Sequence, residues 1–120
     1  MGLDTSHDCW HGPYSSFMEW RVALHRAITG KPAVKEDLRN AWDYGEYDDQ
    51  SIPINVLMNH SDCDGKIPAE VCGSLADALE EIAVKIPANP PDNLSHVQST
   101  LTFIAGLRKA QRRRESVSFH

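Results

Sequence analysis

The stretch from Pro68 to Ile86, PAEVCGSLADALEEIAVKI, decides the fold class of this chain. Its large apolar side chains recur every three or four positions, which is the spacing of one helical face. These side chains are Val71, Leu75, Leu79, Ile82 and Ile86. Pro68 suits the first turn of a helix, where its missing amide costs no hydrogen bond. The stretch therefore predicts an amphipathic helix that packs one face against a core.

Two further segments show the same periodicity. From Tyr14 to Ile28 the apolar positions again lie three or four apart, and Gly30 and Pro32 follow as stop signals. A last helix is expected from Asn93 or Ser95, either of which can cap its start, to about Arg113. Its apolar stripe is Leu94, Val97, Leu101, Ile104 and Leu107. These segments predict a helical bundle.

The remaining segments are less regular. Residues 34–42 predict a short helix that is followed by an acidic loop, and the prolines of residues 87–93 predict a stiff linker. Residues 51–59, SIPINVLMN, fit either a strand or a short helix, because their apolar positions alternate while Pro53 suits a helix start. The tail ESVSFH, residues 115–120, predicts a short edge strand that could pair with residues 51–59.

Length and composition agree with this fold class. A chain of 120 residues with 41% hydrophobic and 24% charged residues fits one globular domain. We therefore expect a mainly α, small single-domain helical bundle of three to four helices over residues 1–120. A short two-stranded β element is expected beside it.

Charge and hydropathy exclude some classes of partner. The net charge of -5 argues against a general nucleic-acid-binding protein, because phosphate affinity needs a basic surface. The basic run from Arg108 to Arg114 is expected to offset the negative end of a helix dipole. No apolar run is long enough to cross a bilayer, and the start lacks an export pattern, so we expect a cytoplasmic protein with no membrane contact.

The loop NHSDCDGKIPAE, residues 59–70, partly resembles the calcium loop of the EF-hand. His60, Asp62 and Asp64 stand at its first, third and fifth ligand positions, and Gly65 and Ile67 stand at its glycine and aliphatic positions. The resemblance implies a divalent cation. It fails at the twelfth position, where Val71 replaces the bidentate glutamate and Glu70 falls one residue short.

The donor types of this loop favour a different ion. An imidazole and the Cys63 thiol are softer ligands than carboxylates, so zinc is favoured over calcium. A structural alternative is that Asp62 and Asp64 accept hydrogen bonds from free amides around Gly65 and turn the chain into the next helix.

A second cluster, HDCWH, lies at residues 7–11. His7, Cys9 and His11 could share a face if the segment were extended, although their spacing is not that of a zinc finger. Three cysteines without an export signal point to metal or redox chemistry more than to a disulfide framework. If the two clusters meet, one metal site could draw on His7, Cys9, His60, Asp62, Cys63 and Asp64. His120 is a weaker further contributor.

Three function classes stay open at this point. The leading hypothesis is a small metal-binding helical protein that acts through a protein partner. The second is a metal-dependent or Cys/His hydrolase with Cys9 or Cys63 as nucleophile, although the aspartates beside Cys63 oppose thiolate formation. The third is a metal-free bundle that binds a partner.

The motifs HDCWHGPYSSF, NHSDCDG and the closing VSFH together resemble a group of small uncharacterised bacterial and phage-borne proteins, over most of the chain. This resemblance implies a bacterial, cytoplasmic, stand-alone domain. It implies no activity.

Overall fold

The computed structural model describes residues 2–86 and 91–120, with residues 91–94 described by their backbone alone. Its helices are α1 (Tyr14–Thr29), α2 (Lys35–Asp43), α3 (Pro53–Met58), α4 (Ala69–Ala83) and α5 (Pro91–Arg113), with a 3₁₀ turn, η1, at Ser6–Asp8. The strands are β1 (Gly2–Asp4), β2 (His11–Pro13), β3 (Lys66–Ile67) and β4 (Val117–Ser118). The mainly α-helical fold and the short β element are confirmed.

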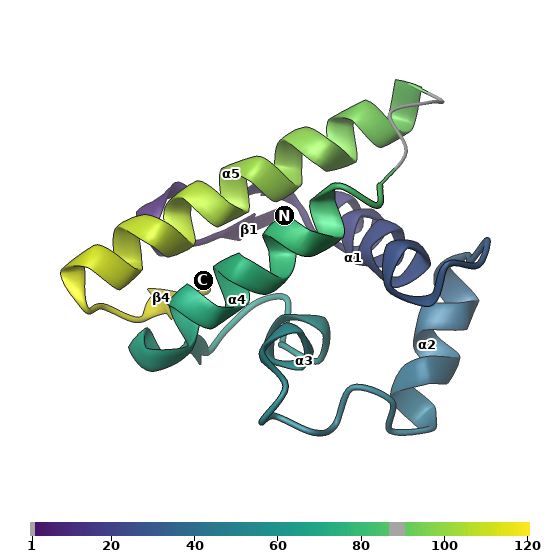
Figure 1. Cartoon of the computed structure of the whole chain (residues 1–120), viewed down its shortest axis with the longest axis horizontal. Coiled ribbons are helices and arrows are strands. Elements are labelled where there is room, and N and C mark those ends of the chain that lie inside the picture. The colour runs from purple at the N-terminus through teal and green to yellow at the C-terminus, as the bar shows by residue number, and fades with distance from the viewer. Residues whose placement is uncertain (1, 87–90) are drawn as a thin grey trace.

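Helices α4 and α5 lie side by side along the length of the molecule, and α2 and α3 lie on the opposite side (Figure 1). The predicted apolar face of α4 is buried as expected, through Leu75, Leu79 and Ile82. On α5, Phe103 and Leu107 are fully buried. Leu101, which the predicted stripe included, is instead 54% exposed.

An aromatic cluster joins the N-terminal segment to α1 and α5. The rings of Trp10 and Trp20 stack with their centroids 5.1 Å apart, and Trp20 lies 5.0 Å from Phe103. Trp20 Nε1 donates to the hydroxyl of Thr100 at 2.9 Å, so its one polar atom is satisfied inside the core. This cluster fixes the start of the chain against the two long helices.

The structure resolves the ambiguous segment and corrects one pairing. Residues 51–59 contain helix α3, with Pro53 in its first turn and Asn55–Met58 buried. The backbone groups of a helix bond to one another, so residues 115–120 cannot pair with residues 51–59 as a strand, which the sequence had allowed. Strand β4 pairs with β3 instead, Ile67 opposite Val117.

The predicted linker and helix start also differ. Residues 87–90 of the predicted linker lie outside the described residues, and α5 already begins at Pro91, before the expected caps at Asn93 or Ser95. A proline is compatible with the first turn of a helix, so the chain enters α5 earlier than the proline content suggested.

The short strands form two ladders that the C-terminal segment joins. Strands β1 and β2 pair antiparallel, with Leu3 opposite Gly12. An isolated bridge pairs Thr5 with Phe119, and Asp4 and His120 exchange two backbone hydrogen bonds of 2.9 Å. The first and last segments of the chain therefore lie in one layer of strands.

Candidate functional site

The C-terminal segment, residues 115–120, lies between the two clusters that the sequence analysis identified, at residues 7–11 and 59–70. On one edge, the Ser118 amide donates to the Ser6 hydroxyl at 2.9 Å, next to the bridge between Thr5 and Phe119. On the other edge, the Phe119 amide donates to the Gly65 carbonyl at 2.9 Å. Neighbouring strands lie about 4.8 Å apart, so the backbone at Thr5–Ser6 and the backbone at Gly65 are separated by the width of one strand.

His60 is held in one orientation at the start of its loop. Its ring lies against Phe119, with centroids 4.1 Å apart, and its Nδ1 lies 2.8 Å from the Ser61 carbonyl. A carbonyl accepts and never donates, so Nδ1 carries the proton and Nε2 of the neutral ring keeps its lone pair. Nε2 lies close to Gly65, 3.5 Å from where a side chain on that residue would begin.

The backbone around this loop has the order of a calcium loop. Gly65, at the sixth position, has a φ of +88°, a left-handed conformation that glycine adopts without strain. Ile67, at the eighth, is fully buried in β3. Helix α3 ends just before the loop and α4 begins just after it. The resemblance thus covers the glycine, the buried aliphatic residue and the exiting helix, whereas the entering helix α3 has only 6 residues and is not the long incoming helix of an EF-hand.

The other loop donors face solvent to different degrees. Cys63 and Asp64 are exposed and Asp62 is partly exposed. The structural alternative had Asp62 and Asp64 accept hydrogen bonds from amides around Gly65. In the structure the acceptor in the turn is instead the Ser61 hydroxyl, to which the Cys63 amide donates at 3.2 Å.

Arg21 supports the backbone at the start of the loop. The sequence did not identify it as a site residue. The residue is 4% exposed, and its guanidinium donates to the carbonyls of His60 at 2.8 Å and Met58 at 3.4 Å. It lies over the rings of Phe17 and Trp42. Burial lowers the pKa of Arg21 to about 10, and the nearby charge of Asp62 partly opposes this. The sequence did carry one signal of its burial, because Arg21 stands four residues after Phe17 and therefore on the apolar face of α1.

In the cluster at residues 7–11, His7 already has two partners. Its Nδ1 lies 2.8 Å from the Ser6 hydroxyl and its Nε2 lies 2.9 Å from a carboxylate oxygen of Glu115. A cation could bind either ring nitrogen only after one of these contacts broke. Glu115 was not among the predicted site residues, because nothing in the sequence brings it near His7.

Cys9 is fully buried, with its sulfur packed against Gly106 of α5. Burial raises the pKa of the Cys9 thiol to about 12. Ligation and nucleophilic attack both need a thiolate, so the folded environment opposes either role for Cys9.

His11 is exposed and lies between two carboxylates. Its Nδ1 is 2.8 Å from Asp4 and its Nε2 is 3.2 Å from Asp8. Hydrogen bonds to Asp4 and Asp8 raise the pKa of His11. The partners of His11 are thus two carboxylates of its own N-terminal segment, residues 2–13.

The two clusters are not merged into one metal site. Over residues 2–86 and 91–120, no three His, Cys, Asp or Glu side chains are arranged to hold an ion. His7, Cys9 and His11 each have contacts within the N-terminal cluster, whereas His60, Asp62, Cys63 and Asp64 share one loop across the C-terminal segment. The donors of the loop are neighbours in sequence but do not converge on one point in the structure, so the loop is a candidate site whose side chains would have to move to hold an ion.

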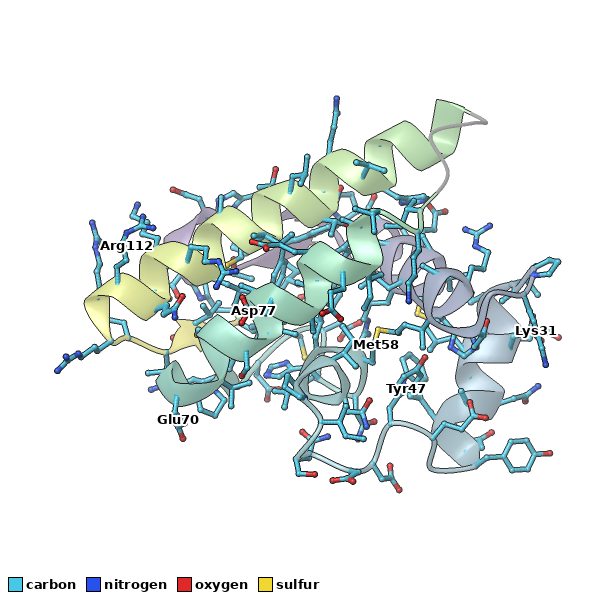
Figure 2. All side chains as sticks on the ribbon, viewed as in Figure 1. Lys31, Tyr47, Met58, Glu70, Asp77 and Arg112 are labelled. Carbon is cyan, nitrogen blue, oxygen red and sulfur yellow. The ribbon has the colours of Figure 1, made fainter. Side chains whose placement is uncertain are left out.

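The remaining predicted features have structural partners. Cys72 is buried in α4, where it packs as a small core residue. Arg108 pairs with Asp77 at 2.6 Å and with Glu80 at 2.9 Å, which ties α5 to α4. Arg112 extends away from the end of α5 (Figure 2).

No family model, curated protein or solved structure matches the chain. Within the part of the chain that the structure describes, no helix has the length and apolar character needed to cross a membrane.

Proposed function

We propose that this protein is a small metal-binding helical protein whose ion is held by the loop from His60 to Asp64. One observation supports the proposal above others. Three donors stand at alternate positions on a loop that has the left-handed Gly65, the buried Ile67 and the exiting helix of a calcium loop.

The donor set fits a transition ion better than calcium. His60 offers the lone pair of Nε2, Asp62 and Asp64 offer carboxylates, and Cys63 offers a thiol. Nitrogen and sulfur ligands suit zinc, whereas calcium needs six or more oxygens. Val71 supplies none at the position where calcium loops carry a bidentate glutamate.

The loop must rearrange to close on an ion, because no three donors of the described residues are arranged to hold one. His60 is fixed by Phe119 and by the Ser61 carbonyl, while the exposed side chains of Cys63 and Asp64 can change rotamer at little cost. The positive charge of Arg21 partly offsets the negative charge of Asp62, which weakens the attraction of this carboxylate for any cation and leaves His60 and Cys63 as the ligands that matter more.

The test is a metal titration of protein purified without a histidine tag. Elemental analysis should find close to one equivalent of zinc after loading and dialysis, and zinc should raise the melting temperature because it binds the folded state. The double variant His60→Ala, Asp62→Ala should lose both effects. The matched control is His11→Ala, Asp8→Ala, which removes the same residue types from the other cluster.

Zinc content unchanged in the His60→Ala, Asp62→Ala protein would remove the loop from any site. No bound ion in the parent protein would leave the metal-free, partner-binding bundle as the better description. Action through a protein partner, the absence of nucleic-acid binding, the cytoplasmic location and the bacterial setting stay predictions.

A further inference from the structure

Ser6, His7 and Glu115 form a continuous hydrogen-bonded chain. The Ser6 hydroxyl lies 2.8 Å from His7 Nδ1, and His7 Nε2 lies 2.9 Å from the Glu115 carboxylate. The His7 side chain is 9% exposed, while Glu115 reaches solvent. A hydroxyl, an imidazole and a carboxylate linked in this order are the parts of an activated serine nucleophile.

When the His7 imidazole is neutral, the hydrogen bonds that link Ser6, His7 and Glu115 have one consistent arrangement of protons. The Glu115 carboxylate can only accept, so His7 Nε2 donates to it and Nδ1 keeps a lone pair. The Ser118 amide donates to the Ser6 oxygen at 2.9 Å, which leaves the Ser6 proton directed to Nδ1. His7 is therefore placed to take the proton of Ser6.

The backbone at Ser6–Asp8 is left-handed at two positions. Among the described residues, the non-glycine residues with positive φ are His7 at +61°, Asp8 at +57° and Arg114 at +56°. Arg114 ends α5 in the usual left-handed way, because its amide donates to the Gln111 carbonyl and the Glu115 amide donates to the Ala110 carbonyl. His7 and Asp8 lie in η1, where the left-handed conformation carries a modest steric cost for a residue with a side chain. This conformation accompanies the hydrogen bond between the adjacent residues Ser6 and His7.

We propose that Ser6 is a nucleophile that accepts an acyl group from a small ester, with His7 as its general base and Glu115 as a positioning residue. A bond forms between Ser6 Oγ and the ester carbonyl carbon as the Ser6 proton moves to His7 Nδ1. The bond to the alkoxy group then breaks, and the alcohol leaves with that proton. Water hydrolyses the acyl-serine by the same steps in reverse.

This inference is independent of the metal loop and replaces the thiol of the hydrolase hypothesis with a hydroxyl. Its rival is a structural one, in which the same contacts only fasten the C-terminal segment to η1. The two differ in one chemical property, because a serine in a structural contact is as unreactive as a free hydroxyl.

The experiment uses a biotinylated fluorophosphonate, which an activated serine attacks with loss of fluoride. The folded parent protein should form one adduct, and peptide mass spectrometry should place it on Ser6. Ser6→Ala should abolish labelling. Glu115→Gln should slow it by about 10²-fold or more, because the amide neither fixes the tautomer of His7 nor stabilises the imidazolium that forms, and Glu115→Asp should recover part of the rate. Glu81→Gln, on the exposed side of α4, is the matched control.

Labelling should persist in the presence of a chelator, which separates this site from the proposed ion. The mapping on the parent protein needs no variant, so misfolding of Ser6→Ala cannot hide the answer. A folded parent protein without an adduct on Ser6, or an adduct that Glu115→Gln leaves as fast as before, would overturn the proposal and leave the structural contact.

Discussion

The imidazole of His60 lies on the ring of Phe119, with the centroids 4.1 Å apart and the planes inclined by 35°. Phe119 also contacts Phe17 edge to face at 6.0 Å and donates its amide to the Gly65 carbonyl. A residue of the C-terminal segment thus fixes both ends of the candidate metal loop and joins it to the core.

Phe119→Ala should destabilise the fold by about 3–4 kcal/mol, since it removes a buried aromatic side chain and leaves a cavity. Zinc affinity should fall as well, because His60 loses the surface that orients it. Urea unfolding measures the first effect. Leu101→Ala, at a half-exposed apolar position, is the control, and we expect it to change stability by less than about 1 kcal/mol.

Replacement of Arg21 by methionine should cost about 1–3 kcal/mol of unfolding free energy. The variant keeps an apolar stem against Phe17 and Trp42 but leaves the buried carbonyls of Met58 and His60 without their donor. The control is Arg26→Met, at a partly exposed position further along the same helix. It should change the unfolding free energy by less than about 0.5 kcal/mol, as substitutions near the surface usually do. Equal effects of the two variants in urea unfolding would contradict the supporting role of Arg21.

One thiol of the native protein should react quickly with a thiol reagent. Cys63 is exposed, whereas Cys9 and Cys72 are buried and burial raises the pKa of both thiols. At neutral pH, Ellman's reagent should therefore release one equivalent promptly and the other two only in denaturant. Cys63→Ser should abolish the prompt phase. A fast second equivalent in the native state would show that Cys9 or Cys72 is more accessible than the structure indicates.

Gly106→Ala should destabilise the protein strongly, whereas Gly73→Ala should not. A methyl group on Gly106 would meet the Cys9 sulfur and lie 2.8 Å from the His7 carbonyl, both fixed groups. At Gly73 it would meet the side chain of Gln111, which can move away, and alanine has the higher helix propensity by about 1 kcal/mol. Thermal unfolding of the two variants decides whether α5 approaches the N-terminal segment this closely.

His11 should titrate above its ordinary pKa of 6.5 in the folded protein, because it is hydrogen-bonded to Asp4 and Asp8. A folded-state pKa above the unfolded value stabilises the fold at pH values below 6.5, and this contribution is lost as the pH rises through the folded pKa. The imidazole proton signals of His11, followed by NMR against pH, measure the shift. Asp4→Asn with Asp8→Asn should return the pKa toward 6.5, and Asp64→Asn should leave it unchanged.

The sequence predicted those parts of the molecule that depend on local pattern. The face of α4 followed from the spacing of Leu75, Leu79 and Ile82, and the turn at Gly65 followed from the loop resemblance. The contact between His7 and Glu115 could not be predicted, because it joins residues 108 positions apart that carry no shared motif. The role of Arg21 was hidden for a related reason, since its acceptors are backbone carbonyls, which every residue has.

The placement of the C-terminal segment between η1 and the His60 loop has a consequence for the order of folding. Ser6 and Ser118 meet across 112 positions, while the turns of α1, α4 and α5 close over a few residues. Contacts between distant segments must overcome the entropy of closing a long loop, so they form slowly. The helices should consolidate first, and insertion of the last strand should complete the domain. In a kinetic analysis, substitutions at Val117 and Phe119 should therefore speed unfolding and leave the folding rate nearly unchanged.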